Sequence, residues 1–83
     1  MIKILTCDYQ ATGLIYLAFS DGTDGVFNLS DYIKSRTGDL LEKLKDDSFA
    51  SRCFIDAGAL CWPHGLELSP SRLYELVHQK QAA

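Results

Sequence analysis

The stretch that decides the fold is 14–29, LIYLAFSDGTDGVFNL. Asp21-Gly22 stands between two apolar runs and is typical of a tight β-hairpin turn, because glycine adopts positive φ without steric cost. This pattern predicts strands over 14–19 and 24–29. A two-residue loop at Asp21-Gly22 places Tyr16 opposite Phe27, so both faces of the hairpin carry apolar pairs. The face that the helices leave bare then needs a cover or a partner.

Two further strand pairs extend outward from this hairpin. Ile2–Cys7 is rich in β-forming residues and predicts a first strand, joined to the second through a turn at 10–13. Near the middle of the chain, 53–56 and 59–62 flank Ala57-Gly58 and predict a second hairpin. A two-residue loop there puts one apolar set on the core face. That set is Cys53, Ile55, Leu60 and Trp62, and the other face carries Phe54, Asp56, Ala59 and Cys61.

Capping residues predict the helices. Ser30 is placed to cap a short turn, Asp39 to cap a second short helix, and Asp46 to cap one more turn. A short strand follows at 66–68, and Ser69-Pro70 starts a last helix that runs to Lys80. We expect an α+β domain of antiparallel hairpins and short helices, in the order β-β-β-α-α-β-β-α. One domain covers 1–83, with a core over 2–78 and a frayed tail at 79–83.

Composition narrows the function classes. The 83 residues contain 8 Lys+Arg and 11 Asp+Glu, for a net charge of −3, and the basic residues are scattered. We therefore expect no direct contact with nucleic acid. Neither a signal peptide nor an apolar run of ~20 residues is present, so we expect a cytoplasmic protein without a membrane span. The three cysteines form no C-x-x-C pair, which favours reduced, partly buried thiols.

Three groups of residues in the sequence are candidates for a functional site. Cys61 and His64 are close in sequence, but no third group is placed to orient a base, so we expect no catalytic residue. An acidic set has neither the spacing nor the ligand number of a metal site, so no metal or other cofactor is expected. This acidic set is Asp21, Asp24, Asp56 and Glu67.

Trp62-Pro63-His64-Gly65 is the most unusual local composition in the chain. Packing explains it best, with Trp62 filling the core and His64 exposed at the tip of a turn. Alternatively, His64 and the edge of the Trp62 ring belong to a contact surface, since aromatic residues are favoured at interfaces. The candidate contact residues are therefore Tyr16, Phe27, Trp62 and His64.

Several of these motifs occur together in a known order. The strand and turn F-S-D-G-T at 19–23, the turn W-P-x-G at 62–65 and the helix start S-P-x-x-L-Y at 69–74 resemble the bacterial family called domain of unknown function 2442. Two departures stand out: His64 replaces a residue that is more often Asn, and the turn at Ala57-Gly58 is short. The resemblance implies a small α+β domain, sometimes joined to a DNA-binding helix-turn-helix domain in longer relatives. It carries no established activity or site residue.

The expected function is that of a non-enzymatic protein-interaction module, with another protein or a second copy as the partner. The resemblance adds the suggestion of an antitoxin-like or regulatory role beside another small protein. One alternative is a small ligand-binding protein or enzyme that uses Cys61 and His64. Another is an accessory domain in transcription regulation that makes no direct contact with DNA.

Overall fold

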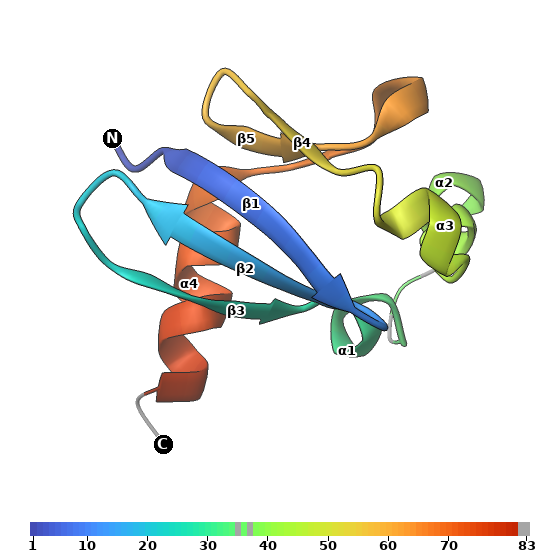
Figure 1. Cartoon of the computed structure of the whole chain (residues 1–83), viewed down its shortest axis with the longest axis horizontal. Coiled ribbons are helices and arrows are strands. Elements are labelled where there is room, and N and C mark those ends of the chain that lie inside the picture. Colours follow the sequence, from blue (N-terminus) through green and yellow to red (C-terminus); the bar gives the residue numbers. More distant parts are fainter. Residues whose placement is uncertain (35, 37, 82–83) are drawn as a thin grey trace.

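The computed structural model describes residues 1–34, 36 and 38–81, and this part of the chain forms two small antiparallel sheets with short helices (Figure 1). Sheet A has the strand order β1-β2-β3 and sheet B the order β4-β5-β6. The predicted α+β class is thus confirmed. The strands are β1 (Ile4–Ala11), β2 (Leu14–Phe19), β3 (Asp24–Asn28), β4 (Phe54–Asp56), β5 (Ala59–Cys61) and β6 (Glu67–Leu68).

Three short helices connect the two sheets, and one longer helix packs against sheet A. The connectors α1 (Leu29–Lys34), α2 (Asp39–Lys43) and α3 (Asp47–Ala50) link the two sheets, and a short 3₁₀ turn, η1 (Pro63–Gly65), precedes β6. Helix α4 (Pro70–Gln81) lies behind sheet A in Figure 1. The order written from the sequence, β-β-β-α-α-β-β-α, omits one short helix and the last strand, although the sequence predicted both elements, the third helical turn at Asp46 and the strand at 66–68. Residues 79–81, predicted to fray, continue α4, while 82–83 lie outside the described residues.

The core lies between the two sheets and α4. Strand β2 alternates, as a half-buried antiparallel strand does, and Ile15, Leu17 and Phe19 point inward with at most 1% exposure. Helix α4 contributes Leu73 and Val77 on one stripe. The largest fully buried side chain is Trp62, at 1% exposure, and its indole Nε1 donates a hydrogen bond to the Ala50 carbonyl oxygen at 2.9 Å.

The predicted register of the β2–β3 hairpin was wrong by one residue. Tyr16 lies opposite Val26, and Phe27 lies opposite Ile15. The loop has three residues, because Phe19 and Thr23 close it through the bond from Phe19 N to Thr23 O, and Gly22 takes the positive-φ position at φ 90. Since a shift of one residue moves side chains to the other face, Phe27 points into the core and Tyr16 points outward.

The other two hairpins have two-residue turns. Strand β1 continues to Ala11, further than predicted, because Thr12-Gly13 alone form its turn, both with positive φ. The second hairpin is as predicted: Ala57-Gly58 form the loop and Asp56 pairs with Ala59. Its predicted core face is confirmed, with Leu60 and Trp62 fully buried and Cys53 and Ile55 packed against the core.

Side-chain caps set most helix starts. Asp46 caps α3 through the bond from Ser48 N at 3.1 Å, and Ser69 caps α4 through Arg72 N at 3.1 Å, both as predicted. The predicted caps of the first two helices were misplaced, since Gly38 rather than Asp39 occupies the N-cap position of α2. Asn28 Oδ1 accepts the hydrogen bond from Asp31 N at 3.1 Å, so Asn28 rather than Ser30 occupies the N-cap position of α1.

The turn at Asp21 also ties sheet A to α4. One Asp21 carboxylate oxygen accepts hydrogen bonds from Thr23 N and Thr23 Oγ1 at 3.0 and 2.6 Å, and the other accepts one from Tyr74 OH at 2.6 Å. These bonds, led by the one from the Thr23 side chain, lower the pKa of Asp21 from 3.8 to about 2. The sequence predicted the turn and did not reveal the link to α4.

The lowered pKa of Asp21 predicts that the folded protein loses stability in acid. Since the pKa of Asp21 is lower in the folded state, its contribution is present above about pH 4 and is lost as the pH falls towards 2. The melting temperatures of the wild type and of Asp21→Asn should therefore differ most above pH 4 and converge near pH 2. Thermal melts of both proteins between pH 2 and 7 test this, and an offset that does not change with pH would contradict it.

In the described part of the chain, none of the helices has the length and apolar character needed to cross a membrane.

Candidate functional site

The four residues predicted as contacts do not form one surface. Phe27 and Trp62, at 3% and 1% exposure, belong to the core, so their assignment to a contact surface is corrected. Tyr16 is half-buried on the outer face of sheet A, where its hydroxyl donates to Asp24 Oδ2 at 2.8 Å. His64 is exposed in η1, as predicted, and its ring stacks on Phe49 with the centroids 6.1 Å apart.

The outer face of sheet B brings chemically distinct side chains together. In its register Phe54 pairs with Cys61, and Cys61 pairs with Glu67, so these three side chains form one row across the three strands. Asp56 points to the same side as Phe54, two residues further along β4. Together with η1 they border an open hollow of about 350 Å³, which His64 also lines. This face thus combines an aromatic ring, a thiol and two carboxylates.

The thiol in this hollow is held in its protonated form. Burial raises the pKa of Cys61, and the carboxylates of Glu67 and Asp56 raise it further. Its Sγ donates towards Ala59 O at 3.6 Å and Glu67 Oε2 at 3.8 Å. Cys61 and His64 line the same hollow, but no hydrogen bond joins them in the described residues. A nucleophilic cysteine needs the opposite environment, with positive charge nearby.

The Lys3 side chain packs against Gly58 at the β4–β5 turn, but among the described residues neither carboxylate of the hollow forms an ion pair. The ion pairs recorded in the described ranges join Lys34 to Asp31 and Lys45 to Glu42, both on the connecting helices, and neither includes Asp56 or Glu67. No group of three or more metal-ligating side chains occurs among these residues either. The hollow therefore presents negative charge beside apolar surface.

A β-bulge exposes a second large apolar side chain on β1, the strand next to β4. The β1–β2 register shifts between Ile4 and Thr6, so Leu5 is the extra residue and its side chain is 60% exposed, whereas Ile4 is buried. Strand β1 lies beside β4, and Ile4 N donates to Gly58 O at 2.9 Å. Phe54, on β4, is 45% exposed.

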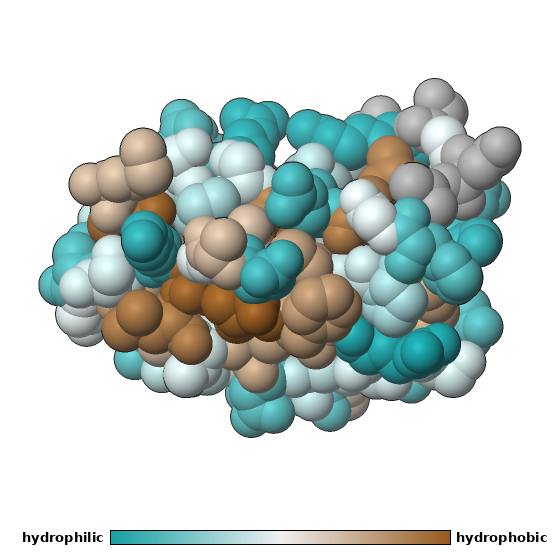
Figure 2. Space-filling model, turned by 90° about the horizontal axis from the view of Figure 1, so that it is seen from above, coloured by the Kyte–Doolittle hydropathy of each residue, from teal (hydrophilic) through white to brown (hydrophobic). Residues whose placement is uncertain are grey.

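We call the set Leu5, Phe54, Asp56, Cys61 and Glu67 the junction surface, because it spans the junction of the two sheets. Figure 2 looks down on the side of the molecule that carries the β4–β5 hairpin in Figure 1, and it shows hydrophobic atoms gathered there, with hydrophilic atoms around them. The outer face of sheet A also exposes apolar side chains, with Leu14 37% and Val26 41% exposed beside Tyr16.

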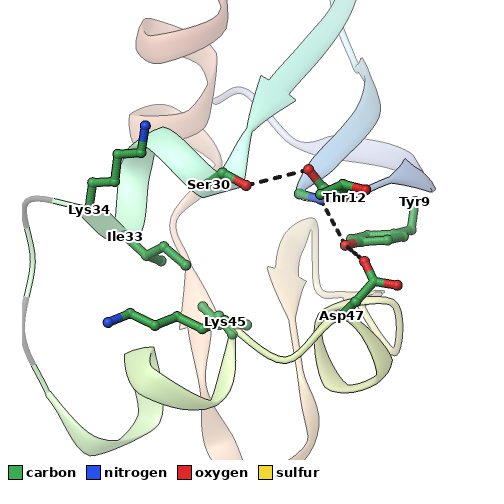
Figure 3. A pocket seen from close by; sticks show the side chains of 9 residues that line it. Tyr9, Thr12, Ser30, Ile33, Lys34, Lys45 and Asp47 are labelled. Carbon is green, nitrogen blue, oxygen red and sulfur yellow. Dashed lines mark hydrogen bonds between the residues drawn. The ribbon is translucent and has the colours of Figure 1, made fainter.

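A larger cavity, of about 420 Å³, lies at the other end of sheet A, between the β1–β2 turn and the connecting helices (Figure 3). Ile33 and Leu44 supply apolar walls. Its polar groups bond to one another: Tyr9 OH donates to Asp47 and accepts from Gly13 N at 2.8 Å. Figure 3 shows Ile33 between the side chains of Lys34 and Lys45, across the cavity from Tyr9. The groups best placed to hold a ligand are thus already used within the protein.

Sequence reasoning found part of the junction surface. The alternation around Ala57-Gly58 placed Phe54, Asp56 and Cys61 on the outer face of the second hairpin, as observed. It missed Leu5, because strict alternation assigns side chains to faces and a bulge interrupts that alternation. No local signal in the sequence marks the bulge.

A model of the family described as "Protein of unknown function (DUF2442)" matches residues 8–79 of the chain. Searches of curated proteins and of solved structures gave no match.

Proposed function

Because the chain belongs to the DUF2442 family, which is described as being of unknown function, we propose a function from its surface: it is a protein-interaction module that binds a basic, amphipathic segment of a partner protein. The junction surface is the binding site. The antitoxin-like or regulatory role implied by the family resemblance is one form of this function.

The observation that carries the proposal is the exposure of Leu5 and Phe54 on the neighbouring strands β1 and β4, with the carboxylates of Asp56 and Glu67 bordering the same hollow as Phe54. Burying a large apolar side chain that was fully exposed contributes roughly 1.5–3 kcal/mol, and aromatic residues are enriched at interface centres. A small domain gains nothing for its own fold by exposing both, since each could pack or be replaced by a polar residue. Their exposure is therefore best explained by contact with another molecule.

Charge defines the chemistry of the partner. Asp56 and Glu67 border the hollow, and the chain carries a net charge of −3. A lysine or arginine side chain of the partner fits between these carboxylates, while apolar residues of the same segment cover Leu5 and Phe54. Complementary charge of this kind favours the correct partner and speeds association at low salt. An acidic partner would be repelled.

The nucleophile alternative has less support. The carboxylates that favour a basic partner also raise the pKa of Cys61, and this disfavours the reactive thiolate at neutral pH.

We expect substitutions in the junction surface to abolish partner binding while leaving the fold intact. The tagged wild type, the double variant Leu5→Ser/Phe54→Ser and the control Val26→Ser are each used to capture proteins from a lysate of the source cells. Val26 is a matched control because it is 41% exposed on the outer face of sheet A. The captured protein is then purified and mixed with each variant, and affinities are measured by calorimetry at low and high salt.

The proposal requires that the wild type and the Val26→Ser variant each form a stoichiometric complex with the partner. The double variant Leu5→Ser/Phe54→Ser should bind at least about tenfold more weakly. The variant Asp56→Asn/Glu67→Gln should also bind more weakly at low salt. Equal binding by all variants, an acidic binding segment, loss of binding only with Val26→Ser, or no purified partner that reconstitutes would each overturn it. Light scattering of the protein alone measures its oligomeric state. A dimer would identify a second copy as the occupant of the junction surface and would contradict a basic partner.

A further inference from the structure

Two cysteines that are far apart in the sequence meet in the fold. Cys7 lies in β1 with its partner Leu17 on the core face of sheet A, and Cys53 immediately precedes β4. Both side chains are half-buried and pack against the core, and each thiol is among the neighbouring groups that shift the pKa of the other. The neighbouring contact from Ile4 N to Gly58 O holds β1 alongside this segment. Two thiols on separate segments are thus in contact at the junction of the sheets.

The third cysteine is kept away from this pair. Cys61 lies on the outer face of sheet B, whereas Cys53 continues the inner face of the same hairpin. The Cys61 thiol is directed towards Ala59 O and Glu67. It therefore supplies an internal control, because it has the same chemistry without a neighbouring thiol.

In the reduced protein, burial favours the protonated form of both thiols, while their contact raises the pKa of Cys53 and lowers that of Cys7 by less than burial raises it. Burial raises the pKa of Cys7, and burial together with the adjacent Cys7 raises the pKa of Cys53 to about 12. Two thiolates cannot form side by side in this half-buried place, so the first proton lost belongs to the pair. Reaction with an oxidant is consequently slow near neutral pH and faster as the pH rises, since the thiolate is the reacting species.

We propose that Cys7 and Cys53 form an oxidisable dithiol that closes to an intramolecular disulfide between β1 and the start of β4. With oxidised glutathione as the oxidant, one cysteine thiolate attacks a glutathione sulfur, which gives a mixed disulfide and releases one glutathione. The second cysteine thiolate then attacks the protein sulfur of that mixed disulfide and displaces the second glutathione. The two cysteine protons end on the two glutathione thiols, so two thiols are oxidised and one glutathione disulfide is reduced.

The cross-link lies next to the junction surface. Leu5 is two residues from Cys7, and Phe54 follows Cys53 directly. Oxidation therefore fixes the segments that present both exposed apolar side chains. The disulfide itself is independent of the proposed partner, because its formation is measured on the protein alone.

The test is oxidation in glutathione buffers of stepped ratio, followed by alkylation, intact mass and peptide mapping. We expect the number of free thiols in the wild type to fall from three to one, with the remaining thiol at Cys61 and a cross-linked peptide pair containing Cys7 and Cys53. Cys61→Ser should give the same cross-link, whereas Cys7→Ser and Cys53→Ser should form none within the chain.

Thermal melts add a second readout. A disulfide that closes a loop of this length stabilises a small domain, so oxidation should raise the melting temperature of the wild type by more than about 10 °C, reversibly with dithiothreitol. Cys7→Ser should melt at the same temperature in both buffers. Three free thiols at the most oxidising ratio, a cross-link to Cys61, or cross-links only between molecules would each overturn the proposal.

Discussion

Trp62→Ala is expected to cost about 3–5 kcal/mol of unfolding free energy, because it removes the largest fully buried side chain and leaves a cavity. A domain of this size has a total stability of roughly 4–12 kcal/mol. The variant should therefore be largely unfolded or close to it at 25 °C. Urea unfolding followed by circular dichroism measures the loss, and a cost below about 1 kcal/mol would show that the core does not depend on Trp62.

Two further variants separate the causes of this loss. Trp62→Phe keeps an aromatic ring but removes the Nε1 donor, so the buried Ala50 carbonyl loses its 2.9 Å bond, at a cost of about 1–3 kcal/mol. Phe54→Ala is the matched surface control. Since Phe54 is 45% exposed, its loss should change stability much less than that of Trp62.

Gly13→Ala is expected to cost about 2–5 kcal/mol for two reasons. Gly13 has φ 81 in the β1–β2 turn, and an L-residue there costs about 1–2 kcal/mol. A Cβ at this position would also lie 1.9 Å from Ser30 Oγ, and crowding of this kind costs about 1–3 kcal/mol. The backbone of the turn cannot shift without breaking a hydrogen bond, because Gly13 O accepts the bond from Leu29 N at 2.7 Å.

The chain offers a control for each cause. Gly22 also has positive φ, at 90°, but nothing lies within 4 Å of its added Cβ, so Gly22→Ala should show the backbone cost alone. In a Ser30→Ala background the closest contact disappears, and Gly13→Ala should cost at least about 1 kcal/mol less than in the wild type. Chemical unfolding of the four proteins and the double variant decides this. Equal costs at Gly13 and Gly22 would contradict the crowding.

Most elements of the fold were predictable because their signals are local. Asp21-Gly22 and Ala57-Gly58 stand between apolar runs, and Ser69-Pro70 marks the start of α4. The register of the first hairpin was not predictable from the same dipeptide. A loop of two or of three residues satisfies the positive φ of Gly22, and the choice between them decides whether Tyr16 and Phe27 share a face or lie on opposite faces, as observed.

The candidate site was predictable only in part. The outer face of the second hairpin followed from alternation, which placed Phe54, Asp56 and Cys61 together. Glu67 joined them only through the pairing of β6 with β5, and Leu5 only through the bulge in β1. Both depend on which strands lie side by side, and this is decided by the packing of the whole core rather than by neighbours in the sequence.

The sequence by itself therefore determined the α+β class, the turns, two of the helix caps and the core face of the second hairpin, because each depends on a few adjacent residues. The tertiary structure alone decided that Phe27 is buried while Tyr16 faces outward, that Leu5 is exposed on the strand beside β4, and that Cys7 meets Cys53. Those outcomes rest on register and on contacts between distant segments, where a shift of one residue turns a side chain from the core to the solvent.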